Sequence, residues 1–213
     1  MRKLSVIVLT MGCTLAPVLA AGDGGVEVGV RTGYAVPIGD ADGSTPLRDL
    51  VDGAIPFQLG VAWRLTDEFR VGGYGQYAYG FAGSAFDRVE SASGMQLRLG
   101  LEVEWMAPPT RWRPWASVSA GWEWLGMSGD LVAQDGERVE LEVDVNGPEA
   151  ALAGGVLFAA DSRLAVGPFL SLGLGRYENA SGELGGQDLP DLVGQEKSVH
   201  GWLQLGVRGT FGN

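Results

Sequence analysis

Met95-Gln-Leu-Arg-Leu-Gly-Leu-Glu-Val-Glu-Trp105 is the stretch that decides the fold of this chain. Every odd-numbered position in it is apolar, and every even-numbered position is Gln, Arg, Gly or Glu. Side chains of a β-strand point to opposite faces with a period of two, so this stretch predicts a strand with one apolar and one polar face. No helix has that period.

Seven further segments alternate in the same way. The predicted strands cover 26–36, 55–65, 69–81, 95–106, 115–125, 149–160, 164–175 and 198–211. Short connections at 66–68, 107–114 and 161–163 alternate with long ones at 37–54, 82–94, 126–148 and 176–197. That asymmetry is typical of outer-membrane barrels, whose periplasmic turns are short and whose outer loops are long. We therefore predict an all-β chain, an eight-stranded antiparallel up-and-down transmembrane β-barrel with both termini in the periplasm.

The N-terminal residues have the pattern of a secretory signal. Arg2 and Lys3 precede an apolar run over 5–12, and Val18-Leu-Ala-Ala21 then offers small residues to a signal peptidase. The run is shorter than the ~20 residues that a transmembrane helix needs. We predict a cleaved signal peptide over 1–21 and a barrel domain over 22–213. The only cysteine, Cys13, falls inside the signal; lipidation at Cys13 is the alternative, although the preceding residues form a poor lipidation motif.

The chain is acidic, with a formal net charge of −11, and most of that charge lies in the four long connections. Nucleic-acid binding requires basic stripes, which this chain lacks, so no nucleic-acid partner is expected. Acidic outer loops would suit divalent cations, including those shared with lipopolysaccharide phosphates, and simple solubility of exposed loops is the other interpretation.

Aromatic residues on the apolar face gather at two heights, with aliphatic residues between them. Two such girdles match the headgroup levels of a bilayer, whereas a soluble ligand-binding barrel has no reason to sort its apolar face by height. Outer-membrane lipids and lipopolysaccharide are therefore the expected surroundings. The predicted girdles consist of Trp63, Phe69, Trp105, Phe158 and Phe211 at the periplasmic level and Tyr34, Phe57, Tyr79, Phe81, Trp122 and Trp124 at the outer level.

The polar face combines small residues with a few charges that point into the barrel. Hairpin register places Arg98 opposite Glu123, and buried charges have to be paired. We interpret the charges as a structural plug; a gate, in which exchanged partners open a narrow path, is the alternative. The predicted interior network consists of Glu27, Arg31, Arg64, Arg70, Arg98, Glu102, Glu104, Glu123 and Arg208.

The sequence predicts the local structure of three further segments. Pro168 cannot donate to a strand ladder, so we predict a bulge or local unpairing there. Residues 131–145 continue to alternate, which predicts that strands 115–125 and 149–160 extend beyond the membrane as a hairpin. Asp40-Ala-Asp-Gly43 is a fragment of a calcium-loop pattern and is expected to be an ordinary surface turn.

The single histidine, His200, lies two residues from Ser198. A Ser–His pair invites comparison with lipid-modifying barrel enzymes, but both residues point inward by parity. We therefore expect His200 to fill the interior beside Trp202. No catalytic, cofactor-binding or metal-binding residues are predicted.

The last strand resembles the C-terminal assembly signal of bacterial outer-membrane proteins, in which apolar positions alternate and an aromatic residue ends the strand. The matching positions are Leu203, Leu205, Val207 and Phe211, while Gly209 and the two residues after Phe211 depart from the pattern. The whole predicted barrel resembles the small barrels of the OmpA transmembrane-domain, OmpX and OmpW type. That resemblance implies insertion by the barrel-assembly machinery of a Gram-negative outer membrane, but it transfers no functional motif.

The expected role is non-enzymatic, in envelope integrity or in surface interaction through the acidic loops. A narrow OmpW-like channel for small or hydrophobic solutes, with a lumen lined by Gly72, Gly154 and Ser171, is the main alternative. A lipid-modifying enzyme and a soluble periplasmic ligand-binding barrel are weaker alternatives.

Overall fold

The structure is a computed structural model that describes residues 25–41, 45–86, 89–108, 111–132, 138–159, 163–188 and 199–212. The predicted signal peptide, Cys13, Ser198 and part of the turn at 40–43 lie outside the described residues. No helix within the described residues is long and apolar enough to cross a membrane.

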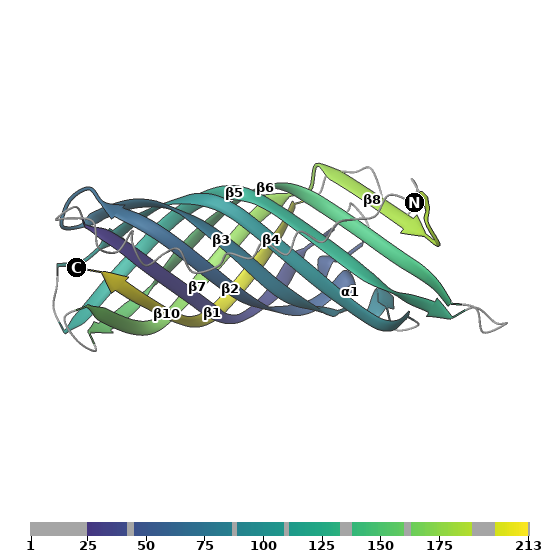
Figure 1. The fold of residues 1–213 in the computed structure, drawn as a ribbon, viewed down its shortest axis with the longest axis horizontal. Helices are drawn as coiled ribbons and strands as arrows, with labels where there is room; N and C mark the ends of the chain where they lie inside the picture. The colour runs from purple at the N-terminus through teal and green to yellow at the C-terminus, as the bar shows by residue number, and fades with distance from the viewer. Residues whose placement is uncertain are drawn as a thin grey trace.

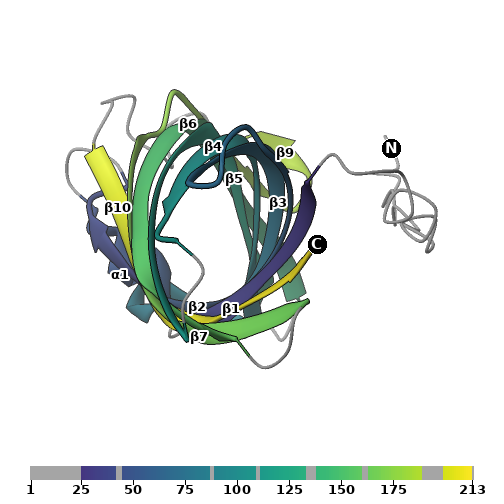
Figure 2. The same cartoon turned by 90° about the vertical axis from the view of Figure 1, so that its left-hand side faces the viewer.

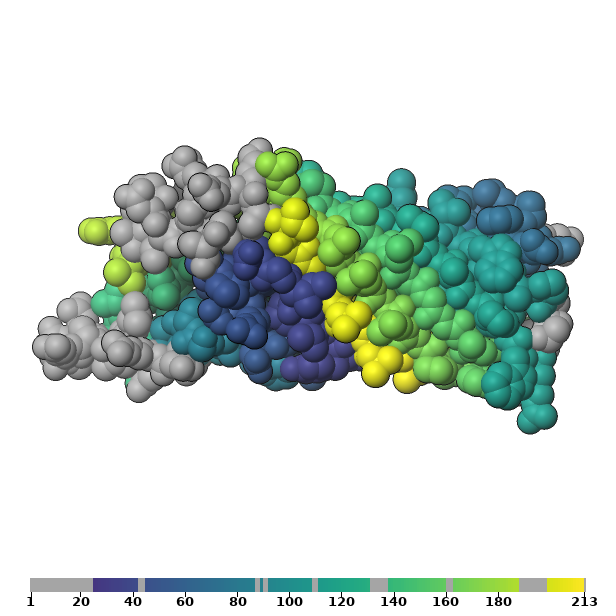
Figure 3. Space-filling view, turned by 180° about the vertical axis from the view of Figure 1, so that it is seen from behind, coloured from purple at the N-terminus to yellow at the C-terminus, as the bar shows by residue number. Residues whose placement is uncertain are grey.

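Eight long antiparallel strands close into a ring, which confirms the predicted fold class (Figures 1 and 2). Each strand pairs with its neighbours along the chain, β5 pairs with β6, and β10 closes the ring between β1 and β7 (Figure 3). The eight are β1 (Val26–Gly39), β2 (Val51–Arg64), β3 (Phe69–Ala82), β4 (Val89–Met106), β5 (Trp112–Val132), β6 (Arg138–Ala159), β7 (Leu164–Arg176) and β10 (Val199–Gly212).

The two ends of the barrel differ. We call the end with the short connections, where β1 begins and β10 ends, the turn end, and the opposite end the loop end. At the loop end α1 (Leu47–Leu50) and the short helix η2 (Ser84–Phe86) fold against each other, and the Gly83 N–H donates to the Leu50 carbonyl at 2.9 Å. Leu47, Val51 and Phe86 are buried there against Met127 and Trp202. Two of the long connections thus supply an apolar plug.

The predicted extension of β5 and β6 is present, because the two strands stay paired as far as Val132 and Arg138. The structure adds two strands that the sequence did not predict, β8 (Asn179–Leu184) and β9 (Gln187–Asp188). Nearer the turn end, β7 pairs with β6. Nearer the loop end, β8 takes that place and pairs with Leu141 to Asn146 of β6 (Figure 1). Gly185 and Gly186, both with positive φ, form the two-residue turn to β9, a conformation that favours glycine.

Pairing between β6 and β7 is interrupted at Pro168. Val156 and Leu157 have no ladder partners opposite Pro168 and Gly167, yet the register is the same on either side of the gap. On its other edge β7 pairs with β10 without a break. The predicted disturbance is therefore a local unpairing and not a bulge.

Side chains alternate between the lipid-side surface and the interior, as the period of two requires. Leu101 is 70% exposed and Leu205 65% exposed, whereas their neighbours on the other face are buried or half-buried. Gly154 has the parity of the outward-facing Leu152, so the predicted placement of Gly154 in the lumen is wrong.

Candidate functional site: the charged barrel interior

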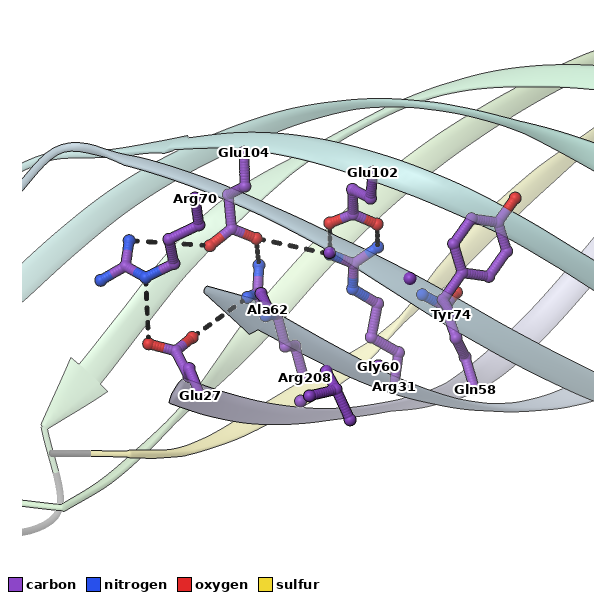
Figure 4. A pocket seen from close by; sticks show the side chains of 14 residues that line it. Glu27, Arg31, Gln58, Gly60, Ala62, Arg70, Tyr74, Glu102, Glu104 and Arg208 are labelled. Atoms are coloured by element: carbon purple, nitrogen blue, oxygen red, sulfur yellow. Dashed lines mark hydrogen bonds and ion pairs between the residues drawn. The ribbon is translucent and has the colours of Figure 1, made fainter. Parts of the chain in front are cut away.

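Two groups of buried charges divide the interior. The first, the turn-end network, consists of Glu27, Arg31, Arg70, Glu102, Glu104 and Arg208 (Figure 4). The second, the loop-end cluster, consists of Gln96, Arg98, Glu123, Glu149, Tyr177, His200 and Trp202.

In the turn-end network, three guanidinium groups meet three carboxylates. Arg31 binds Glu102 through both Nη atoms, at 2.9 and 2.5 Å, and its Nη2 lies 3.6 Å from Glu104. Arg208 donates to Glu104, and the Arg70 Nε lies 3.2 Å from a Glu27 oxygen. Strand register places Arg70 opposite Glu104 and Arg31 opposite Arg208, and the side chains then meet across the interior. Every charge therefore has an opposite partner within reach, as burial demands.

Trp115 supports this network from inside the barrel. The guanidinium carbons of Arg208 and Arg31 lie 4.2 and 4.8 Å from its ring centroid, in cation–π geometry. Trp115 belongs to a second apolar cluster with Met106, Leu157 and Phe169. The network and Tyr74 line a pocket, and Gly60 and Gly72 are among the other residues of its walls (Figure 4).

Glu123 is the centre of the loop-end cluster and is fully buried. Its Oε1 accepts hydrogen bonds from the Gln96 Nε2 at 2.9 Å, the Tyr177 hydroxyl at 2.9 Å and the Trp202 Nε1 at 3.1 Å. Its Oε2 faces the Arg98 Nη2 at 3.2 Å and the His200 Nε2 at 3.4 Å. One side chain on β5 therefore ties together β4, β10 and the segment after β7.

Arg98 bridges two carboxylates. Its Nη2 lies 2.9 Å from the Glu149 Oε2 in addition to its contact with Glu123. The His200 ring stacks face to face on Tyr177 at a centroid distance of 3.6 Å and an interplanar angle of 7°.

The structure brings eight of the nine predicted interior charges inside the barrel, but not Arg64. Arg64 is exposed at the turn end, where β2 finishes, and its predicted placement in the interior is wrong. The alternation extends to the last residue of the strand, but the barrel wall does not extend far enough to cover a long side chain there.

Ten of the predicted girdle residues are exposed on the outward face, and Trp122 is half-buried there, with its Nε1 donating to Asn146 at 3.3 Å. The predicted assembly-signal residues Leu203, Leu205, Val207 and Phe211 are all exposed on β10. Trp112, which the sequence had placed in a connection, begins β5 and stacks edge-on against Phe158.

Glu149, Gln96 and Tyr177 were not predicted as site residues. Glu149 shares its parity with Ala151 and Ala153, so its inward direction was readable from the strand pattern. Tyr177 lies just beyond β7, where alternation gives no direction, and only the packing on His200 places it inside.

Outside the barrel wall, carboxylates collect on the outward side of the extended sheet. We call Asp130, Glu140, Glu142, Asp144 and Glu183 the acidic face. Asp130 is paired with Glu140, and Glu142 with Glu183, so like charges stand opposite each other across strands. Partial burial, followed by the charges of Glu140, Asp144 and Glu183, raises the pKa of Glu142 above its ordinary value. Partial burial also raises the pKa of Asp144.

No family model matches the sequence, and no curated protein matches it. Among solved structures, the chain is similar to a major outer-membrane protein from Thermus thermophilus, with 13% identity, a TM-score of 0.58 and coverage of 90% of this chain and 100% of that one. It also matches Neisserial surface protein A, with 12% identity, a TM-score of 0.48 and coverage of 86% and 95%. Ail of Yersinia pestis matches with 13% identity, a TM-score of 0.44 and coverage of 89% and 100%. The chain has the fold of the small outer-membrane β-barrels that its sequence resembles.

Proposed function

We propose that the protein is a non-enzymatic integral protein of a Gram-negative outer membrane, acting in surface interaction or envelope integrity through its acidic face. In this proposal the turn end lies in the periplasm and the loop end outside the cell, the arrangement that short turns and long loops favour. The acidic face is the observation that carries the proposal.

The position of the acidic face supports a role outside the membrane. Asp130 follows the girdle residue Trp124 on β5 by about six residues, or roughly 20 Å of strand. β8 widens the sheet at this level, so that carboxylates from three strands share one side. An extension of this kind adds nothing to the closure of the barrel below it.

The proposed partners are divalent cations and, through them, lipopolysaccharide phosphates. Carboxylate oxygens are the ligands that hard cations such as Mg²⁺ and Ca²⁺ prefer. A cation bound between facing carboxylates would relieve the like-charge pairs, and its remaining coordination positions are available to phosphate oxygens. The interior supports a non-enzymatic role, because its charged side chains form ion pairs with one another in the two buried groups.

The test compares E140Q/E142Q/D144N with the wild type in bilayer nanodiscs, measuring lipopolysaccharide binding at fixed Mg²⁺. We expect Mg²⁺-dependent binding by the wild type, loss of that binding with a chelator, and a severalfold reduction in the triple variant. D67N/E68Q removes two exposed carboxylates from the opposite end of the barrel and serves as the matched control. Equal binding by the triple variant and the wild type would refute the proposal.

A further inference from the structure

The loop-end cluster contains one more negative charge than positive charge. Glu123 and Glu149 are both buried, and their ion-pair partners are Arg98 and, when protonated, His200. Among the described residues, the other titratable groups that face the cluster are the phenols of Tyr177 and of Tyr74 on β3, and both are neutral in ordinary conditions. With a neutral histidine, the cluster would carry an uncompensated buried charge, which costs several kcal/mol.

We infer that Glu123, Glu149 and His200 together hold one proton at neutral pH, and that this proton makes the loop-end cluster a pH-sensitive lock on the extended sheet. The three side chains each present an oxygen or nitrogen atom, all within 4.8 Å of one another. The extra proton brings the cluster to electrical neutrality without any further residue.

A divalent metal at the same three residues is the competing explanation of their geometry. The Arg98 Nη2, however, lies 2.9 Å from the Glu149 Oε2 and 3.2 Å from the Glu123 Oε2. The guanidinium therefore takes the position between the carboxylates that a metal would need. A proton requires no such displacement.

Tyr177 connects the cluster to the extended sheet. Its ring stacks on His200 and its hydroxyl donates to Glu123. The next two residues begin the attachment of β8, because the Glu178 N–H donates to the Asn146 carbonyl at 2.9 Å and the Asn179 amide donates to the Asn146 side chain at 3.1 Å. When the proton is lost, repulsion between the carboxylates acts directly on the residue that holds β8 in place.

Proton counting predicts a specific pH profile. Between about pH 5 and 6.5 the unfolded chain also carries one proton on these residues, on His200, so stability is flat. Above about pH 6.5 the unfolded histidine is neutral while the folded cluster keeps its proton. The equilibrium constant for unfolding then rises about tenfold per pH unit, or about 1.36 kcal/mol, until the folded cluster releases its proton.

Few side chains of this sequence titrate in the pH range where the decline is predicted. The chain has one histidine, and its one cysteine lies in the predicted signal peptide, so no other side chain of ordinary pKa titrates between about pH 6.5 and 9. The experiment is urea unfolding of the purified protein in lipid vesicles, with tryptophan fluorescence as the probe, repeated at pH values from 5 to about 9.

Two variants and a control separate the lock from a merely structural pair. E149Q leaves Arg98 and Glu123 balanced without an added proton, so its stability should stay flat above about pH 6.5, where the wild type declines. H200Q should lose stability from about pH 5 upward, because its unfolded chain has lost the competing proton site. E102Q, in the turn-end network, should lower stability but keep the wild-type profile.

A wild type whose unfolding constant stays constant above pH 6.5 would overturn the inference, as would an E149Q variant with the wild-type decline. If Zn²⁺ stabilises the wild type and a chelator abolishes the pH profile, the site binds metal and the proton lock is wrong.

Discussion

The Arg98–Glu123 pair is the residue-scale contact on which the barrel interior depends most. R98M leaves two carboxylates buried without their guanidinium, and E123Q weakens the contacts that Glu123 makes with β4, β10 and Tyr177. Breaking a buried pair from one side typically costs about 3–5 kcal/mol. On gels, a folded barrel changes to the mobility of the unfolded chain when it is heated past its unfolding temperature. We expect this change at a lower temperature for both variants than for the wild type, with the larger decrease for R98M.

The matched control for this pair is R48M. Arg48 and Asp49 form an ion pair of 3.9 Å with the Arg48 side chain 77% exposed, and exposed pairs contribute about 0–1 kcal/mol. An R98M variant as stable as R48M would show that the buried pair contributes nothing to stability.

Residue positions inside strands were largely predictable, and positions beyond strand ends were not. Alternation and hairpin register together place Arg98 opposite Glu123, because both residues lie within one regular ladder. Arg64 shows the limit at the edge of the wall. Its position in the alternation is an inward one, but its side chain is exposed because the barrel wall ends there. Tyr177 shows the limit beyond the strand, because its inward position depends on packing against His200 of the neighbouring strand β10, and not on alternation.

At the scale of the element, β7 is the strand whose pairing is most constrained. A Cβ on Gly167 would lie 1.8 Å from the Val156 carbonyl oxygen, next to the gap in the ladder at Pro168. The backbones of β6 and β7 can approach closely here because Gly167 has no Cβ. We expect G167A to push the strands apart and to destabilise the barrel by about 1–3 kcal/mol in urea unfolding.

G209A is the control for that prediction. Gly209 is also a strand glycine and lies nearby on β10, but a Cβ there meets no atom within 4 Å. Its stability should match that of the wild type, since alanine fits the space. Equal losses in both variants would mean that glycine is required for reasons other than close approach.

Strand existence followed from the sequence, whereas strand ends and the two added strands did not. The extension over 131–145 was predicted because its alternation continues past the girdle. β8 (Asn179–Leu184) alternates polar residues with Ala180, Gly182 and Leu184, but only one of these three is a large apolar residue, so the pattern is weak. The strand forms because β6 continues beyond the end of β7 and leaves an unpaired edge. That edge exists only in three dimensions, although Gly185-Gly186 was a turn signal in the sequence.

For the whole molecule, the decisive property is an apolar surface that faces outward all around the ring. Leu101 on β4 is 70% exposed in the middle of the aliphatic band, between the two aromatic levels. In a bilayer a charge at that depth costs about 2–4 kcal/mol, whereas in water the same substitution at an exposed position is close to neutral. L101R therefore distinguishes a membrane barrel from a water-soluble barrel with the same strands.

We expect L101R to fold less efficiently into lipid vesicles and to unfold at lower urea than the wild type. L65R is the matched control, because Leu65 is 65% exposed but lies in the turn after β2, outside the band. The contrast follows from the surroundings and not from exposure, which is nearly equal at the two positions. Equal stability of L101R and L65R would mean that water surrounds the barrel, and the outward aromatic levels would then require another explanation.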